Sequence, residues 1–157
     1  MITFPKYYTI PFTKAAYDKM QTDLEQLLVK EKAIIVRVQV AREMGDLSEN
    51  GAYKYAKFEL GNTRREIGRL KRLLLHGKVI PKKANPTVVG FGVTVVLLLK
   101  GKEMTYTLVG KHESDPFQGK LSQESPLGQA LLGRKVGDVF QLELPAGPVE
   151  YKILRME

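Results

Sequence analysis

The chain has 157 residues, enough for one large domain or two small ones, and its formal net charge of +8 favours an anionic partner. It contains no cysteine, which excludes a disulfide framework and a cysteine-based zinc site and favours a reducing compartment. No apolar run approaches the roughly 20 residues that span a bilayer, and the start lacks the apolar core of a signal peptide, so we expect a soluble cytoplasmic protein.

A long helix is predicted to begin after Thr13, which closely follows Pro11 and suits an N-cap. From Tyr17 onwards, apolar side chains alternate in steps of three and four, and only Glu31 breaks the series. Gly45 ends the run because glycine suits the position just past the last helical turn. At 1.5 Å per residue, roughly 32 residues form an arm about 48 Å long.

A second helix is predicted from Ser48, as its N-cap, to His76-Gly77, with the same spacing of apolar residues. The two apolar stripes should pair antiparallel, because neither can bury itself alone and the connection is short. Folding the chain back at the tip places Glu31 opposite Thr63 and next to Arg64, so the polar interruptions of both stripes share one level.

The carboxyl half changes to strand patterns after a short linker that contains Pro81 and Pro86. Strands are predicted over residues 92–99, 104–109, 139–144 and 149–154. A short helix should follow Ser125 as N-cap, with Pro126 in its first turn and Gly133 past its end. We therefore expect an α+β protein with an N-terminal antiparallel coiled-coil helical hairpin (1–77), a linker (78–86) and a small α+β domain (87–157).

Carboxylates are the groups in this chain most suited to chemistry. The two histidines, His76 and His112, have no partner at metal-ligand spacing, and the sequence has no phosphate-binding loop or nucleophile elbow. Asp46 and Glu49, in the turn between the helices, could supply oxygen ligands to Mg²⁺. Two acids are too few for a tight site, so a partner would have to complete it. Ordinary helix capping is the alternative explanation for both acids.

Basic residues approach the tip on the first helix and leave it on the second, with tyrosines among them: Arg37, Arg42, Lys54, Lys57, Tyr53 and Tyr55. Cations beside aromatic rings suit a phosphate backbone and stacked bases. Further basic residues continue toward the base of the arm: Arg64, Arg65, Arg69, Lys71 and Arg72. We interpret those last five as a solvated helical face.

The segment Ala41 to Asn50, followed by Tyr53 and Ala56-Lys57, resembles the hairpin tip of the bacterial Gre transcript-cleavage factors, a family of transcription elongation factors. The carboxyl half agrees at Phe91 to Val95, Tyr106 to Gly110, Ser125 to Gly133, Gly137-Asp138 and Glu150-Tyr151. The chain departs from the family pattern at Met44, where histidine is common, and at Gly51-Ala52, a pair that often carries glutamate.

The resemblance implies an accessory factor of bacterial RNA polymerase that is not itself an enzyme. Its hairpin would enter the polymerase secondary channel and stimulate Mg²⁺-dependent cleavage of backtracked RNA at the nascent 3′ end, which rescues arrested complexes. Asp46 and Glu49 would be the catalytic acids and would bind Mg²⁺ jointly with the polymerase, since the free protein would hold the ion weakly. Ser48, Asn50 and Tyr53 would support the tip.

The family's carboxyl domain is similar to FK506-binding domains and docks on the polymerase. The resemblance places docking contacts at Asp115, Ser122, Ser125 and Pro126. We expect a monomer that binds no membrane. Three other functions stay open: a secondary-channel regulator that does not cleave, although such a protein would be expected to alter the tip acids; a prolyl isomerase or chaperone built on the carboxyl domain, whose aromatics fit core positions better; and a stand-alone nucleic-acid-binding hairpin.

Overall fold

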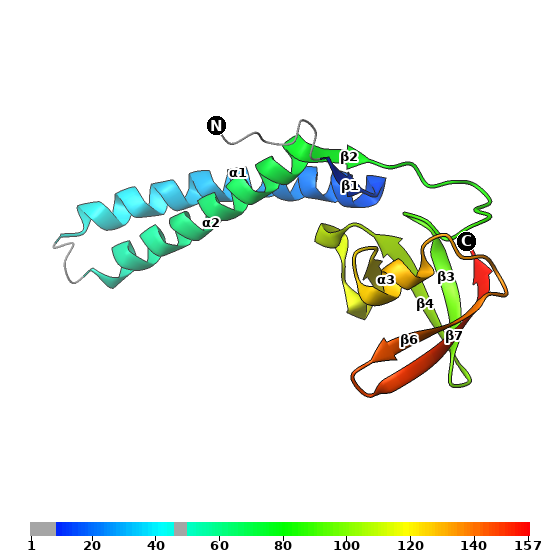
Figure 1. The fold of residues 1–157 in the computed structure, drawn as a ribbon. Helices are drawn as coiled ribbons and strands as arrows, with labels where there is room; N and C mark the ends of the chain where they lie inside the picture. The colour runs from blue at the N-terminus through cyan, green and yellow to red at the C-terminus, as the bar shows by residue number, and fades with distance from the viewer. Residues whose placement is uncertain (1–8, 46–49) are drawn as a thin grey trace, which may run out of the picture. The chain divides into compact units, whose positions relative to one another are not determined.

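The computed structural model describes residues 9–45 and 50–157. It divides into two compact units, and the described part of the first is residues 17–45 and 50–77, a helical hairpin. The second unit joins residues 9–16 to residues 78–157. Figure 1 shows the hairpin as two long helices and the carboxyl half as a twisted sheet with a short helix. The predicted α+β class is confirmed. The predicted domain limits stay a prediction.

The hairpin consists of α1 (Lys14–Glu43) and α2 (Gly51–His76). The side chains that meet between them are those of the predicted stripes: Ile34, Ala41, Ala56, Thr63, Ile67 and Leu70 are all buried. Arg64 Nε donates a hydrogen bond to Glu31 Oε1 at 2.6 Å, so the predicted polar level of the hairpin is confirmed. With 30 residues, α1 is about 45 Å long at 1.5 Å per residue.

The start of α1 is as predicted, but the start of α2 is not. Thr13 Oγ1 accepts a hydrogen bond from Ala16 N at 3.3 Å, which confirms Thr13 as the N-cap of α1. The N-cap of α2 is Asn50 rather than Ser48, and the helix begins at Gly51. Asparagine suits this position because its amide oxygen accepts from the α2 backbone while its amide nitrogen donates to the end of α1. Ser48 and Glu49 lie outside the described residues.

The carboxyl unit contains a five-stranded sheet in the order β5-β4-β3-β7-β6. Its strands are β3 (Thr94–Leu99), β4 (Lys102–Val109), β5 (Lys120–Ser122), β6 (Val139–Leu144) and β7 (Gly147–Met156). The four predicted strands are present, and their neighbours pair antiparallel. The unpredicted β5 pairs parallel with β4. Lys100 and Gly101 both have positive φ in the two-residue turn between β3 and β4, as a tight hairpin requires.

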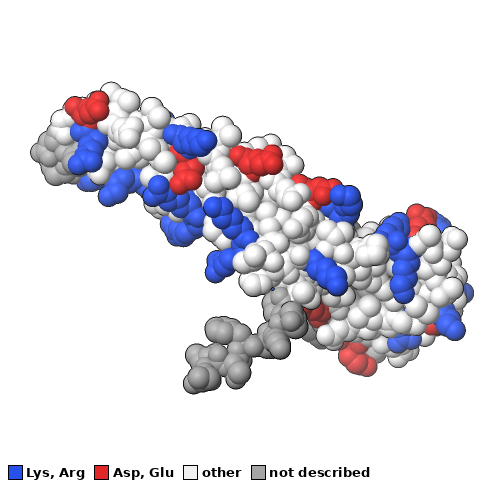
Figure 2. Space-filling model, turned by 90° about the horizontal axis from the view of Figure 1, so that it is seen from above, with Lys and Arg blue, Asp and Glu red and all other residues white. Residues whose placement is uncertain are grey.

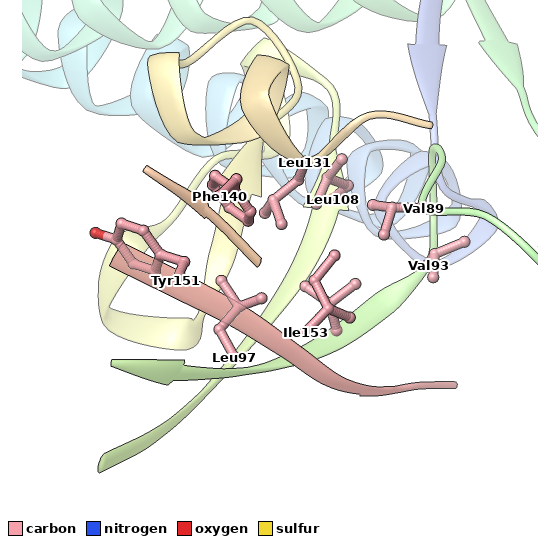
Figure 3. Close-up of a cluster of buried hydrophobic side chains, with 9 residues drawn as sticks. Val89, Val93, Leu97, Leu108, Leu131, Phe140, Tyr151 and Ile153 are labelled. Carbon is pink, nitrogen blue, oxygen red and sulfur yellow. The ribbon is translucent and has the colours of Figure 1, made fainter. Parts of the chain in front are cut away.

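The core of this unit lies between the sheet and α3 (Pro126–Leu131), as Figure 3 shows. Its buried side chains are Val89, Val93, Val95, Leu97, Leu108, Leu131, Phe140, Tyr151 and Ile153. The rings of Phe140 and Tyr151 stack with centroids 5.5 Å apart. Of the carboxyl-half aromatics expected in the core, Phe117 is a wrong prediction: it is fully exposed on the 3₁₀ turn Pro116–Gln118.

A second, two-stranded sheet was not predicted, and it joins β1 (Ile10–Phe12) to β2 (Gly77–Val79). Phe12 is completely buried. Thr13 donates from N and Oγ1 to the Glu113 carboxylate, at 2.7 and 2.6 Å. A Cβ at Gly110 would lie 2.4 Å from the carbonyl oxygen of Pro11, so only glycine allows this approach. Residues 9–16 therefore belong to the carboxyl unit although they precede the hairpin in the chain.

Glu113→Ala should loosen this segment, because two hydrogen bonds to a charged acceptor are lost together. We expect a loss of about 1–2 kcal/mol in the free energy of unfolding. Hydrogen exchange should accelerate at the amides of Ile10, Phe12 and Thr13 and in the first turn of α1. Glu143→Ala, which removes an exposed acid from β6, is the control. Unchanged exchange at Ile10, Phe12 and Thr13 would show that the Glu113 contacts do not hold the segment.

Candidate functional site

The hairpin tip is closed by Asn50, which contacts both helices. Asn50 Nδ2 donates to the carbonyl of Ala41 in α1 at 2.7 Å, and Asn50 Oδ1 accepts from Tyr53 N in α2 at 3.0 Å. Gly45 follows α1 with φ +120°, a backbone conformation that favours glycine. Asp46, Ser48 and Glu49 lie outside the described residues, in the loop of residues 46–49 between these two fixed points. The loop that carries both predicted acids is thus short and held at its base.

Asn50→Ala should free both ends of this loop, since one side chain supplies the cap of α2 and the contact to α1. Loss of such a cap costs about 1–2 kcal/mol of stability. We expect thermal unfolding to report that loss. Asn62→Ala is the matched control, because Asn62 is exposed and accepts only from Arg65 one turn away. Equal melting temperatures of the two variants would contradict a closing role for Asn50.

The basic residues near the tip differ in how they are neutralised. Arg37 lies 2.8 Å from Glu59 Oε2, an ion pair without the alignment of a hydrogen bond, and Lys30 lies 3.3 Å from Oε1 of the same carboxylate. Lys57 Nζ lies 5.4 Å from the centroid of the Tyr53 ring, within cation–π range. Within the described part of the chain, no ion pair involves Lys57 or the other two predicted tip cations, Arg42 and Lys54.

Farther from the tip, the basic residues have structural partners. Arg64 pairs with Glu31, Arg65 with Asn62, and Arg69 with Glu66. The hydrogen bonds from Arg69 lower the pKa of the Glu66 carboxyl, and the same contact raises the pKa of Arg69. Figure 2 shows basic side chains along the hairpin with acidic side chains among them. These contacts are compatible with the interpretation of the five basic residues as a solvated helical face.

The described residues contain no cluster of three metal-ligating side chains. The predicted ligands, Asp46 and Glu49, lie outside the described residues. Carboxylate oxygens are the ligands that Mg²⁺ prefers, and this ion commonly takes one or two of them while keeping several waters. The donor set of the loop fits a shared Mg²⁺ site.

An apolar groove that was not predicted lies on the hairpin at the end of α1 and the start of α2. We call it the tip groove. It encloses about 350 Å³, and its apolar lining comes from both helices: Val36, Val40, Met44, Ala52 and Tyr55. Val36 and Val40 lie four residues apart on one stripe of α1, and Met44 follows four residues later in the turn after the helix. These residues lie beside the predicted seam, so the stripe pattern did not indicate the groove.

The predicted docking residues of the carboxyl unit lie in one compact segment. Asp115 Oδ1 accepts from Phe117 N at 3.1 Å and so caps the 3₁₀ turn. Ser125 caps α3 by accepting from Gly128 N at 3.1 Å, and its hydroxyl donates to Ser122 O at 2.6 Å. These two caps give the segment a defined shape. Pro126 is exposed in the first turn of α3, and the unpredicted exposed ring of Phe117 adjoins Asp115.

In the described ranges, no helix combines the length and the apolar character that crossing a membrane demands.

Comparison with known proteins gives matches along nearly the whole chain. Residues 10–79 match the model of the transcription elongation factor N-terminal domain, and residues 83–157 match the GreA/GreB C-terminal model. Transcription elongation factor GreA of Geobacillus kaustophilus is 41% identical over 94% of this chain and 96% of its own length. The protein of the same name from Bacillus subtilis is 38% identical over 93% and 95%.

Among solved structures, the crystal structure of GreA factor homolog 1 from Thermus thermophilus covers 95% of this chain and 99% of its own. Its TM-score is 0.45 at 26% sequence identity.

Proposed function

The chain belongs to the GreA/GreB family of transcription elongation factors, and we propose that Asp46 and Glu49 are the residues through which it acts. As a member of this family it stimulates transcript cleavage by RNA polymerase, and it is an accessory factor rather than the catalyst itself. Its partner is bacterial RNA polymerase. The residues, the ion and the route by which it acts are the subject of the proposal.

One observation carries this proposal: Asn50 closes a short acidic loop at the end of a two-helix arm. The arm is about 45 Å long at 1.5 Å per residue, so it can carry the loop through the secondary channel to a buried catalytic centre. The contacts of Asn50 join the end of α1 to the start of α2 at the base of this loop. The protein acts in the cytoplasm, as a monomer, on an elongation complex.

In that centre, Asp46 and Glu49 hold a Mg²⁺ ion together with acids of the polymerase. A bound Mg²⁺ ion supplies Lewis-acid activation of water and neutralises charge on the phosphate. The loop carboxylates also accept hydrogen bonds from the attacking water and so orient it toward the RNA phosphodiester. Because the chain supplies only part of the ligand set, the free protein binds the ion weakly.

Arg42, Lys54 and Lys57 contact the phosphates of the backtracked RNA 3′ segment beside the loop. Lys57 and Tyr53 act as a unit, because the ring holds the ammonium group near the tip. Arg37 contributes through Glu59 and stiffens the hairpin. In the carboxyl unit, Asp115, Ser122, Ser125 and Pro126 form the surface that docks on the polymerase, and the two caps preserve its shape.

The test is to add the protein to a backtracked elongation complex with Mg²⁺ and to follow the labelled 5′ end of the RNA. Shortened RNA should appear at a rate that increases with protein concentration, and the shortened transcript should resume elongation when nucleotides are added. Complexes without the protein measure the intrinsic rate. Binding without faster cleavage would instead indicate a channel regulator that does not cleave.

A further inference from the structure

We propose that the tip groove binds an apolar side chain of RNA polymerase when the hairpin is inserted. This inference rests on the proposed function and adds a second contact to it. The acids of the tip bind the ion and its cations contact the RNA, whereas the groove binds a side chain of the polymerase. The inserted hairpin is thereby held both by the contacts of its tip and by the contact of its groove with the polymerase.

The groove has the character of an interaction surface. Val36, Val40, Met44 and Tyr55 each expose between 46% and 73% of their surface. Single exposed apolar residues are common in soluble proteins, but a contiguous group around a concave site marks an interaction surface. Met44 and Tyr55 suit such a role, because methionine adapts to a partner's shape and tyrosine provides a large, rigid contact.

The charges around the groove favour protein over nucleic acid as the occupant. Its one charged lining residue, Arg37, already faces Glu59 at 2.8 Å. Arg42 comes two residues after Val40, and Lys57 two residues after Tyr55, so each lies about 200° around its helix from the groove residue. Nucleic acid binding depends on cations at the phosphates. Arg42 and Lys57 therefore lie on the other side of their helices from Val40 and Tyr55.

The position of the groove identifies the polymerase as the partner. From Val36 to Met44 it covers the last 12 Å or so of α1, and the acidic loop follows directly. If that loop reaches the catalytic centre, the groove lies inside the polymerase at the same moment. A second copy of the hairpin seated in the groove would thicken the arm where it must enter, so a channel-wall side chain is the occupant.

Val40→Glu tests the proposal, because it places a charge in the groove at a position that is already 46% exposed and therefore compatible with folding. We expect its affinity for core polymerase without nucleic acid, measured by competition with labelled wild-type protein, to fall at least tenfold. Tyr55→Ala should weaken binding several-fold, and Tyr55→Phe should retain it. Leu75→Glu, at a leucine 78% exposed near the other end of α2, is the control and should bind within twofold of the wild type.

Wild-type affinity of both Val40→Glu and Tyr55→Ala would overturn the proposal. A loss seen only with backtracked complexes, and not with polymerase alone, would assign the groove to RNA and also overturn it. Circular dichroism checks that Val40→Glu is folded. If it is not folded, the proposal is tested by comparing the polymerase affinities of Tyr55→Ala and Tyr55→Phe. A cleavage assay of the wild-type protein, run in parallel, distinguishes failure of the proposed function from failure of the groove proposal. If the wild-type protein does not stimulate cleavage, the proposed function is contradicted. If it does, and Val40→Glu binds polymerase normally, only the proposed role of the tip groove is contradicted.

Discussion

Replacing Asp46 and Glu49 together by alanine should abolish stimulated RNA cleavage while leaving polymerase binding intact. Loss of a single preorganised group that stabilises developing charge typically lowers a rate by about 10²–10³-fold. The double variant removes two such groups, so we expect cleavage to return to the intrinsic rate of the polymerase. Both residues are in the loop between Gly45 and Asn50, outside the helix seam, so the hairpin should fold and compete for polymerase as the wild type does.

The single variants sharpen this test because they change charge with little change in shape. Asp46→Asn and Glu49→Gln keep a hydrogen-bonding oxygen but lose the negative charge that Mg²⁺ prefers. Each should slow cleavage, and higher Mg²⁺ concentration should restore part of the rate. Glu43→Gln is the matched control, because Glu43 is an exposed acid in the last turn of α1. If the double alanine variant cleaves at the wild-type rate, the two acids do not hold the ion.

The hairpin could be predicted in detail because the sequence pattern that specifies it is local and repetitive. Two stripes with a three-four spacing define two helices, and a short connection leaves only one way to pair them. The prediction reached single residues: Glu31 broke one stripe and Arg64 lay beside the break in the other, and the structure joins them at 2.6 Å. The caps at Thr13 and Ser125 were likewise readable from the sequence.

The features that could not be predicted depend on contacts far apart in the chain. Strand β1 has three residues and pairs with β2, about 65 residues later, and no local pattern specifies such a pairing. Thr13 meets Glu113 across 100 positions. At the tip, both Ser48 and Asn50 suit an N-cap, and the choice depends on the contact to Ala41 in the other helix. The positions of Asp46 and Glu49 themselves stay a prediction.

Gly128→Ala should destabilise the carboxyl unit, although alanine usually favours a helix over glycine by about 1 kcal/mol. A Cβ at Gly128 would lie 2.1 Å from Ser122 O and 3.0 Å from Gln123 Cα, and these are backbone atoms that cannot rotate away. Because overpacking of this kind typically costs about 1–3 kcal/mol, the steric term outweighs the helix preference. We expect a lower melting temperature.

Gly61→Ala is the matched control, because there the substitution of glycine by alanine in a helix should stabilise the protein rather than destabilise it. Gly61 is inside α2, and a Cβ there would meet nothing within 4 Å, so only the helix preference remains and stability should rise by about 0.5–1 kcal/mol. Since Ser122 and the cap at Ser125 must move to admit the Gly128 methyl group, that variant should also bind polymerase more weakly than Gly61→Ala does. Equal stability of the two variants would show that α3 can shift away from β5 at little cost, and the docking segment would then lack the rigidity that we ascribe to it.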